Sequence, residues 1–582
     1  MKYTVLAITA TVITLSACST AQKQDLGGDP IRVNQVGYYP QQEKTAVIEQ
    51  EAACDCYTLT DAQGKTVWEG AAVREATSPW SGKVRQVIDF SSVKQPGTYT
   101  LHAGNYSQQV IIADHALQSL AQSTMQSYYM QRSGCVIEEQ YAGAYARPLA
   151  HPDTVVYVHP SAASKGRPAG AIISSPCGWY DAGDFNKYIV NSAFTTGMML
   201  DVYQQAKTYF DAMPLNIPEH GDTTPDFLDE IMYNLKWMVT MQDPTDGGVY
   251  HKLTTPSFEA FIMPVEAQQP RYVVKKTTTA ALDYAASMAQ AARLYQSYPA
   301  YTAFCTQALQ AAEMAYRWAV KHPDTYYLQD EMNEHFEPKI STGAYDDSDV
   351  SDEFFWASTE LYLSTGKAAY LKDVQRYMPI GFKLPVWGNV AALATFDWIN
   401  NSDNEQAKAL AGQLCPSLLA YADAQIEKTA TSCYNSPFGN VADDFHWASI
   451  PESCAGVGIV LMYAYKLTGN EKYLTGAQQN IDYMLGRNAT GYCYVTGFGT
   501  KPVMHPHQRI STADGIEAPV PGLVSGGPNP GQQDKANLSV PYPSDYPDES
   551  YLDHHDSYAS NEIAINWNAY VVGLTGWLDY MR

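Results

Sequence analysis

The chain has 582 residues, of which 45% are hydrophobic, and its formal net charge is −24 at pH 7. This length suits one large domain and a smaller one, and the apolar content is sufficient for packed cores. Because nucleic-acid affinity comes largely from Lys and Arg that neutralise phosphates, so acidic a chain is not expected to bind nucleic acid. Aromatic residues make up 12%, with 43 Tyr and 11 Trp, which suits platforms for sugar rings but equally suits core packing.

The first residues predict an export signal. Lys2 supplies a positive charge, and the apolar run Val5 to Leu15 is too short to span a bilayer. Leu15-Ser16-Ala17-Cys18 resembles a bacterial lipobox, in which the Cys18 thiol takes the lipid; an ordinary signal peptide with an incidental Cys is the alternative. We therefore expect a signal peptide over residues 1–17, a tether over 18–29, and a monomer lipid-anchored at the bacterial cell envelope, at the outer membrane or in the periplasm.

Residues 30–114 show short alternating runs separated by turn residues. Tyr57–Thr60 precedes a turn at Asp61–Gly64, Lys65–Trp68 follows it, and Gln95-Pro96-Gly97 precedes Thr98–Leu101. The last such run is Gln108–Ile112. Many short antiparallel strands in about 85 residues predict a β-sandwich.

From residue 115 to the end, apolar residues return at three- and four-residue intervals, which predicts amphipathic helices. The expected helices are Ala116–Tyr129, Thr195–Ala206, Pro225–Met241, Lys275–Tyr298, Tyr301–Lys321, Glu353–Ser364, Val390–Phe396, Glu405–Lys428, Cys454–Leu467, Lys472–Leu485 and Asn561–Tyr580. So many helices in one unit indicate hairpins arranged in a ring, an α/α barrel whose loops form a cleft at one end. The irregular stretches 142–184 and 496–558 exceed the usual length of connectors, so function is expected there.

These two stretches supply candidate catalytic acids. Glycoside hydrolysis needs two carboxyl groups, one protonated to assist the leaving oxygen and one ionised to activate water or attack the sugar. Asp181-Ala182-Gly183-Asp184 places two acids where both can reach one water, although helix capping or a turn is the plain alternative. The second candidate is Glu562, predicted in the first turn of the last helix; many first-turn Glu residues merely compensate the helix dipole, and an acid role requires a raised pKa.

A third cluster, His505-Pro506-His507-Gln508-Arg509, offers fixed donors for sugar hydroxyls. The spacing of the two His around Pro506 is poor for zinc, so hydrogen bonding is favoured. A structural Arg509 that bridges two loops is an equally open interpretation.

An ordered set of motifs resembles glycoside hydrolase family 9, the cellulase family, in its subgroup with an N-terminal immunoglobulin-like domain. The set comprises Asn34–Tyr38, Trp179–Lys187, Pro225–Glu230, Asp352–Ala357, Gly486–Asn488, Val495–Gly499, Gly526–Asn529 and Asp556–Glu562. The resemblance implies an immunoglobulin-like β-sandwich followed by an (α/α)6 barrel, with inversion at the anomeric carbon.

The resemblance also implies residue roles: Asp184 as base, Asp181 holding the water, and Glu562 as acid. Inversion predicts carboxyl groups about 6.5–9.5 Å apart. Substrate contacts are implied for His507, Arg509, Tyr558, Trp447 and Trp179. The family's Trp-Gly-Ser-Asn appears here as Trp447-Ala448-Ser449-Ile450, and its His-His-Arg as His507-Gln508-Arg509, so substrate detail is open.

Metals are expected in structural roles only. Asp349, Asp352 and Glu353, with Ser348 and Asn389, resemble the family's calcium site, and hard oxygen ligands suit Ca²⁺; an acidic helix start explains these residues equally well. A zinc site in relatives would map to Cys135, His151 and His159, but the family's Arg-Cys-Gly is replaced by Arg132-Ser133-Gly134-Cys135, which argues against it.

The expected function is endo-acting hydrolysis of β-1,4-glucosidic bonds in cellulose-derived or related β-glucans. One alternative is an exo-acting β-glucosidase or β-glucosaminidase on cello- or chitosan-oligosaccharides. A non-catalytic surface glycan-binding lipoprotein is another, although a binder does not need all three acids. A polysaccharide lyase would require a Tyr or His base and a basic cleft, which an acidic chain does not favour.

Overall fold

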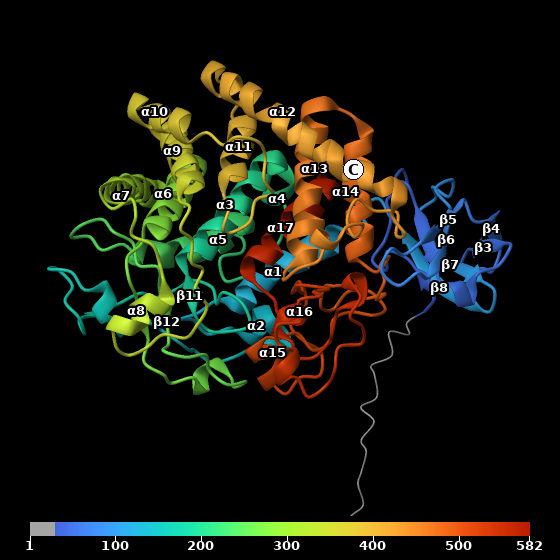
Figure 1. Ribbon diagram of the computed structural model, residues 1–582, viewed down its shortest axis with the longest axis horizontal. Helices are drawn as coiled ribbons and strands as arrows, with labels where there is room; N and C mark the ends of the chain where they lie inside the picture. Colours follow the sequence, from blue (N-terminus) through green and yellow to red (C-terminus); the bar gives the residue numbers. More distant parts are fainter. Residues whose placement is uncertain (1–28) are drawn as a thin grey trace, which may run out of the picture.

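The computed structural model describes residues 29–582, so the predicted signal peptide, the predicted lipidation site Cys18 and nearly all of the tether lie outside the described residues. Within the described part, every helix is too short or too polar to cross a membrane. The chain forms a small β domain beside a large helical one (Figure 1).

The N-terminal domain is the predicted β-sandwich. One sheet has the order β1 (Ile31–Arg32), β2 (Thr45–Ile48), β6 (Val84–Asp89), β5 (Arg74–Thr77); the other has the order β4 (Thr66–Gly70), β3 (Tyr57–Thr60), β7 (Gly97–Ala103), β8 (Tyr106–Ile112). All pairings between these strands are antiparallel. The sandwich has its own hydrophobic core, which contains Leu59, Ile88, Leu101 and Val110. Alternate residues of β7 and β8 face this core, because side chains along a strand alternate between its two faces.

Buried polar contacts fix the sandwich to the helical domain. Asn34 donates to Asp482 Oδ1 over 2.8 Å, and the Arg487 guanidinium contacts both Asp482 Oδ2 at 3.0 Å and the Thr45 hydroxyl at 2.6 Å. All four side chains are less than a tenth exposed. In Figure 1 the sandwich accordingly lies against the part of the helical domain that contains α14 (Glu471–Met484).

The helical domain is a double ring of helices, which confirms the predicted (α/α)6 barrel. Helices buried on nearly all sides form the inner ring: α3 (Ile189–Gln205), α6 (Thr278–Leu294), α9 (Ser351–Thr365), α11 (Ala391–Asn400), α13 (Val457–Thr468) and α17 (Ile565–Tyr580). The outer helices are α1 (Gln118–Gln131), α5 (Asp226–Thr240), α7 (Thr302–Lys321), α10 (Ala368–Tyr377), α12 (Glu405–Lys428) and α14. An outer helix such as α7 buries one stripe of Ala, Tyr and Trp and exposes its polar face, as expected for a helix that packs on one side.

Long loops and short elements cover one end of the barrel. They include α2 (Glu139–Ala142), α8 (Gln329–His335), α15 (Arg509–Ala513) and α16 (Tyr558–Asn561), whereas α4 (Lys207–Asp211) lies at the other end, where Phe210 packs on Gly576 of α17. The strands β9 (Val156–Val158), β10 (Ile172–Ile173), β11 (Lys187–Tyr188), β12 (Lys252–Thr254) and β13 (Tyr272–Val273) form a small sheet of order β10-β9-β13-β12-β11. Strands of two or three residues are too short for a recognisable alternating pattern, and the sequence did not predict this sheet.

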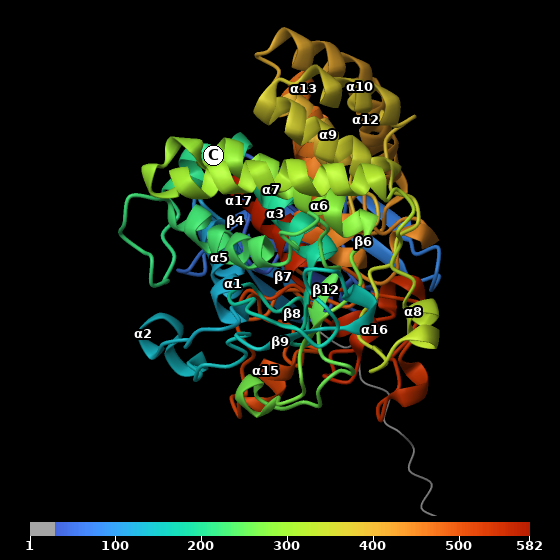
Figure 2. The ribbon, with the colours of Figure 1, turned by 90° about the vertical axis from the view of Figure 1, so that its left-hand side faces the viewer.

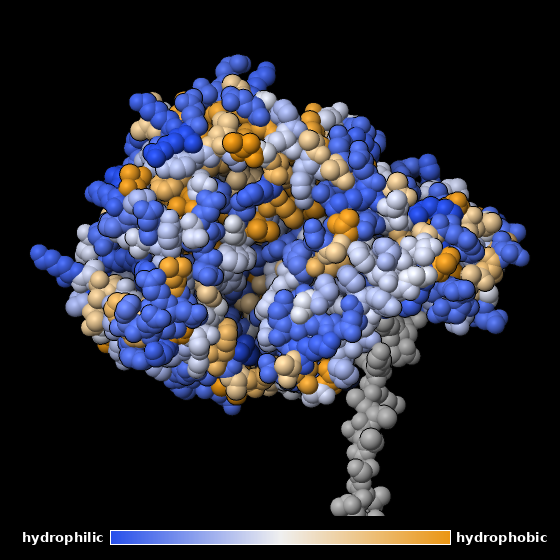
Figure 3. Space-filling view, in the orientation of Figure 1, coloured by the Kyte–Doolittle hydropathy of each residue, from blue (hydrophilic) through white to orange (hydrophobic). Residues whose placement is uncertain are grey.

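The loop end lies opposite α10 and α12 in both ribbon views (Figures 1 and 2). The space-filling view shows a hollow on this face, between the lobe over α8 and the lobe over α15 and α16 (Figure 3). The candidate catalytic acids come from the loops at this end of the barrel.

Candidate active site

Asp184 is a buried carboxylate with one oxygen held and the other free of protein donors. Its Oδ2 accepts hydrogen bonds from Asn186 Nδ2 at 2.6 Å and from the Tyr188 hydroxyl at 3.1 Å. Its Oδ1 is buried and has no hydrogen-bond partner among the described residues. Because both donors bind Oδ2, Oδ1 is left to accept a hydrogen bond from a water molecule.

Asp181 lies next to Asp184 and has donors on both of its oxygens. Oδ1 accepts from Asn191 Nδ2 at 2.8 Å and Oδ2 from the Tyr345 hydroxyl at 2.6 Å. Burial, with the Asp184 charge, raises the pKa of Asp181 to about 7, although these two donors lower it. Tyr345 has a φ of 50°, a left-handed conformation that bulky residues rarely adopt.

A buried ion network fixes the loop that carries these acids. The Asp153 carboxylate contacts Lys187 Nζ at 2.7 Å and Arg271 Nε at 2.8 Å, and Arg271 also donates to the Phe185 carbonyl over 2.9 Å. Phe185 and Lys187 flank Asn186, a partner of Asp184. The backbone around the candidate base is therefore held from outside its own segment.

The sequence predicted Glu562 in the first turn of the last helix, and this prediction is wrong. Glu562 follows α16 in extended conformation, with φ −67° and ψ 160°, and α17 begins only at Ile565. Its segment pairs with distant backbone: His507 N donates to the Asn561 carbonyl over 2.8 Å, and Gly526 N to the Glu562 carbonyl over 3.0 Å. These bonds stabilise an extended segment where the local sequence pattern favours a helix.

Glu562 lies close enough in space to the two Asp residues for their charges to act on it, although nearly 380 positions separate them in the chain. Burial, together with the charges of Asp184 and Asp181, raises the pKa of Glu562 to about 8, while Arg509 lowers it. Glu562 is therefore protonated at neutral pH, as a general acid must be.

Arg509 bridges the loops, the alternative that the sequence left open. Its backbone amide and Nη1 donate to the Gly183 carbonyl over 3.1 and 2.8 Å, and its Nε donates to the Glu259 carbonyl over 2.8 Å. A Cβ on Gly183 would lie 2.1 Å from the His507 carbonyl oxygen, a distance that no side chain tolerates. Glycine between the two Asp residues thus permits the close approach of the two loops.

His507 presents a neutral imidazole at the site. Burial lowers its pKa to about 4, and its Nδ1 lies 2.6 Å from the His555 carbonyl oxygen. Since a carbonyl only accepts, Nδ1 carries the proton and the Nε2 lone pair is left to accept from a hydroxyl group.

Trp447 and Tyr558 form an aromatic surface beside His507. Their ring centroids lie 5.2 Å apart at 32°, and the Tyr558 and His507 rings lie 6.0 Å apart. Trp447 is 37% exposed, which is unusual for so large an apolar side chain. An exposed ring beside polar side chains is the arrangement that sugar faces stack on.

Trp179 is not in the site, contrary to the prediction that it contacts substrate. It is fully buried, its Nε1 donates to Glu230 over 2.8 Å, and it packs on Tyr128. A cleft Trp and a core Trp look alike in a sequence, which explains the error. Four residues that the sequence did not single out contact the acids instead: Asn186, Tyr188, Asn191 and Tyr345. Asn186 lies within the Trp179–Lys187 motif and Tyr188 directly follows it, whereas no local signal indicates Tyr345.

The expected calcium residues lie in or beside a cavity of about 170 Å³ lined by Asp349, Asp352 and Asn389 among others. Asp349 Oδ1 is engaged by Ser351, and Asp352 Oδ2 accepts from the Val390 amide. The buried Glu353 and Asp283 carboxylates, by contrast, have no hydrogen-bond partner on either oxygen among the described residues, and the Asn389 Oδ1 also has none. Burial raises the pKa of both carboxyls well above the usual range. Orphaned hard oxygens of this kind fit a cation.

The expected zinc residues do not converge. Both ring nitrogens of His151 and both of His159 make hydrogen bonds to hydroxyl or carbonyl oxygens. Within the part of the chain that the structure describes, Cys135, His151 and His159 do not bring three ligand atoms within 4.8 Å of one another.

The chain is similar to known proteins over nearly its whole length. Sequence profiles match at residues 118–575, "Glycosyl hydrolase family 9", and at residues 27–108, "Cellulase N-terminal ig-like domain". A xyloglucan-specific endo-β-1,4-glucanase of Bacteroides ovatus is 50% identical over 568 residues, covering 97% of this chain and 96% of that protein. Endoglucanase D of Acetivibrio thermocellus is 31% identical, covering 94% and 83%.

A solved family 9 structure from Bacteroides ovatus superposes with a TM-score of 0.91 at 50% identity, covering 95% of this chain and 99% of that one. These likenesses confirm the predicted fold class and the predicted activity, an endo-acting hydrolase of β-1,4-glucans. With the family profile matching the whole barrel, this chain belongs to glycosyl hydrolase family 9.

Proposed function

We propose that this endo-β-1,4-glucanase cuts the glucan backbone of xyloglucan by an inverting mechanism, with Asp184 as base and Glu562 as acid. The observation that supports xyloglucan as the substrate is the 50% identity, over 97% of the chain, with an enzyme named for xyloglucan. Other relatives, at 29–32% identity, are named as endoglucanases, a cellobiosidase and a cellodextrinase.

The geometry supports the two catalytic roles. In an inverting reaction a carboxylate removes a proton from water as the water attacks the anomeric carbon, and a carboxylic acid gives a proton to the departing glycosidic oxygen. Asp184 has the free Oδ1 that accepts this proton, and Asp181, held by Tyr345 and Asn191, helps to orient the water. Glu562, kept protonated by its raised pKa of about 8, supplies the second proton.

Sugar binding is assigned to the exposed aromatic surface and the neutral imidazole beside it. Trp447 and Tyr558 stack against a glucose face, and His507 Nε2 accepts from a sugar hydroxyl. Because backbone contacts already use its Nε and Nη1, Arg509 mainly positions the catalytic loop.

The test is a time course of the purified chain on xyloglucan, on soluble unbranched cellulose and on cello-oligosaccharides. We expect the highest kcat/KM on xyloglucan, a rapid fall in polymer size, and products that first appear as the α-anomer in NMR spectra. Single sugars from the outset would support the exo-acting alternative, β-anomers would contradict inversion, and binding without any turnover would support the glycan-binding alternative. Equal rates on both polymers would contradict the xyloglucan assignment.

We further propose that a calcium ion is held near Asp352, Glu353, Asp283 and Asn389. The support is the set of buried oxygens without donors on Glu353, Asp283 and Asn389, next to Asp352 at the start of α9. Such an ion would stabilise the start of α9 and take no part in the reaction.

Export and lipid attachment at Cys18 are proposed from the sequence alone. A Cys18→Ala variant expressed with the wild type in a Gram-negative host tests them. We expect labelled fatty acid in the wild-type protein of the outer-membrane fraction and none in the variant, and monomers of both by light scattering. Equal labelling would contradict the lipid anchor.

A further inference from the structure

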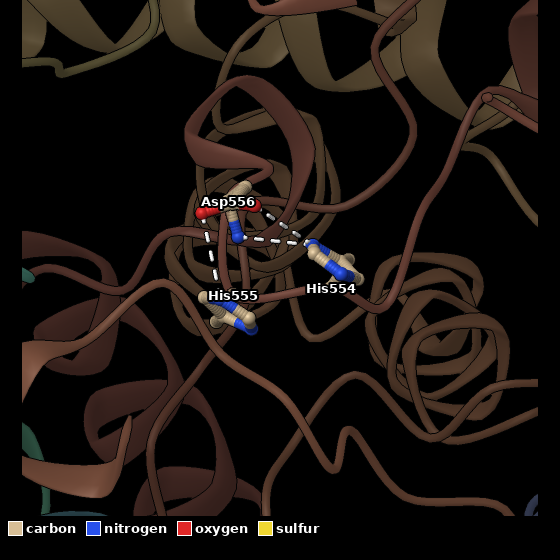
Figure 4. Close-up of side chains that lie close together, drawn as sticks. All are labelled: His554, His555 and Asp556. Atoms are coloured by element: carbon tan, nitrogen blue, oxygen red, sulfur yellow. Dashed lines mark hydrogen bonds and ion pairs between the residues drawn. The ribbon is translucent and has the colours of Figure 1, made fainter. Parts of the chain in front are cut away.

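Three consecutive residues on the rim of the site, His554, His555 and Asp556, point their ligand atoms toward one another (Figure 4). His555 Nε2 lies 3.4 Å from Asp556 Oδ1, and His554 Nδ1 lies 3.7 Å from Asp556 Oδ2. In the described part of the chain, no other group of three His, Cys, Asp or Glu residues has its ligand atoms within 4.8 Å of one another.

These separations resemble those of a tetrahedral metal centre. Zinc binds His nitrogen at about 2.0–2.1 Å and carboxylate oxygen at about 2.0–2.2 Å, which places neighbouring ligand atoms roughly 3.3–3.5 Å apart. The observed 3.4 and 3.7 Å therefore require only small side-chain shifts around an ion.

The His554 ring presents an unprotonated nitrogen on the side of Asp556. The backbone amide of Asp556 donates to His554 Nδ1 over 3.2 Å, so Nδ1 carries a lone pair there, and an ion bound at Nδ1 would replace this hydrogen bond. The His554 and His555 rings stack, with centroids 4.5 Å apart at 24°.

The loop is fixed on its inner side and open on its outer side. The His555 carbonyl oxygen accepts a hydrogen bond from His507, and the His555 ring packs edge-on against Phe261, with ring centroids 5.3 Å apart. The three side chains remain 23–40% exposed, so an ion can enter from solvent. The excess negative charge of the chain, −24, raises the local concentration of cations.

We propose that His554, His555 and Asp556 bind one divalent transition-metal ion, with Zn²⁺ the natural choice for two imidazoles and one carboxylate. Water completes the coordination. The site is separate from the catalytic acids and is not required for hydrolysis; the ion would hold the loop that leads into α16, which carries Tyr558.

Zinc binding to the full chain can be measured by isothermal titration calorimetry in excess Ca²⁺, which keeps oxygen-rich sites filled. We expect one Zn²⁺ per wild-type chain and a Kd that is weaker by more than about tenfold in His555→Gln and in His554→Gln, since loss of even an outer partner of a metal ligand costs about 10–100-fold. His335→Gln, the same change at an exposed His on α8, is the matched control and should bind as the wild type does.

The variants must be folded for this comparison, so circular dichroism and melting curves accompany the titrations. Asp556→Asn, which removes the shared carboxylate charge, replaces either His variant that fails to fold. Wild-type-like zinc binding in the folded variants, or no binding by the wild type, would overturn the proposal.

Discussion

The guanidinium of Arg509 joins the base loop to the acid: it donates to the carbonyl oxygen of Gly183 over 2.8 Å, and its charge lowers the pKa of Glu562. Gly183 lies between Asp181 and Asp184. One residue thus acts on the position of the base and on the proton affinity of the acid.

This relationship predicts a shift in the pH profile. A general acid must be protonated, so wild-type kcat/KM should fall as the pH rises through about 8, the pKa of Glu562. Arg509→Gln removes a cation that favours ionisation and therefore moves this alkaline limb to higher pH, in addition to lowering the rate. Lys339→Gln, which changes an exposed cation whose ion-pair partner is the exposed Glu337, is the control. A limb at unchanged pH in Arg509→Gln would contradict the electrostatic role.

The two catalytic acids should differ in their dependence on the leaving group. General acid or base catalysis contributes typically 10²–10⁴-fold, so Glu562→Gln and Asp184→Asn should each lower kcat on xyloglucan by at least about that factor. A dinitrophenyl cello-oligoside releases dinitrophenolate, a leaving group that needs little protonation. Glu562→Gln should therefore recover most of its rate on that substrate, and Asp184→Asn should not. If both variants recover equally, the assignment of acid and base is wrong.

Glu562 also makes stability depend on pH. Its pKa in the folded chain, about 8, exceeds the ordinary value of 4.5, so its contribution is fully present below pH 4.5 and is lost as the pH rises through about 8. Glu562→Gln carries no such ionisation. We expect the variant to melt at a higher temperature than the wild type at pH 8 to 9, with the difference shrinking toward pH 5; a constant difference across that range would contradict the burial of this carboxyl.

The exposed ring of Trp447 should contribute binding rather than chemistry. Trp447→Ala removes an aromatic contact worth roughly 1 kcal/mol, which corresponds to about a fivefold increase in KM on xyloglucan oligosaccharides, with kcat nearly unchanged. Trp447→Phe keeps a smaller aromatic ring, so its KM should lie between those of the wild type and of Trp447→Ala. A loss confined to kcat would place this side chain elsewhere in the reaction.

Calcium removal should destabilise the fold. A ligand at a hundredfold excess over its Kd stabilises the native state by about 2.7 kcal/mol, so chelation should lower the melting temperature of the wild type by a few degrees, restored by added Ca²⁺. Glu353→Gln should melt at the same temperature with and without chelator. An identical response to chelator in the two proteins would exclude Glu353 as a ligand.

Sequence patterns predicted the elements whose signals are local. The alternating strands within residues 57–112 and the helix α5, with its three- and four-residue periodicity, lie where they were expected. What could not be predicted depends on distant partners. Glu562 is extended because residues 507 and 526 pair with its segment, and Tyr345 reaches Asp181 from another loop. The helix α3 begins at Ile189, six residues before the predicted start at Thr195. The segment Ile189–Phe194 is buried on all sides and therefore shows no amphipathic pattern.

The contact of Asn34 and Thr45 with the Asp482–Arg487 pair makes the sandwich a structural part of the barrel rather than a detachable appendage. Without residues 30–114, the buried side chains of Asp482 and Arg487 would lose the neutral partners Asn34 and Thr45 and would be exposed to water. The two domains should consequently unfold together in one cooperative transition, and a chain shortened to its helical portion should be less stable than the whole chain.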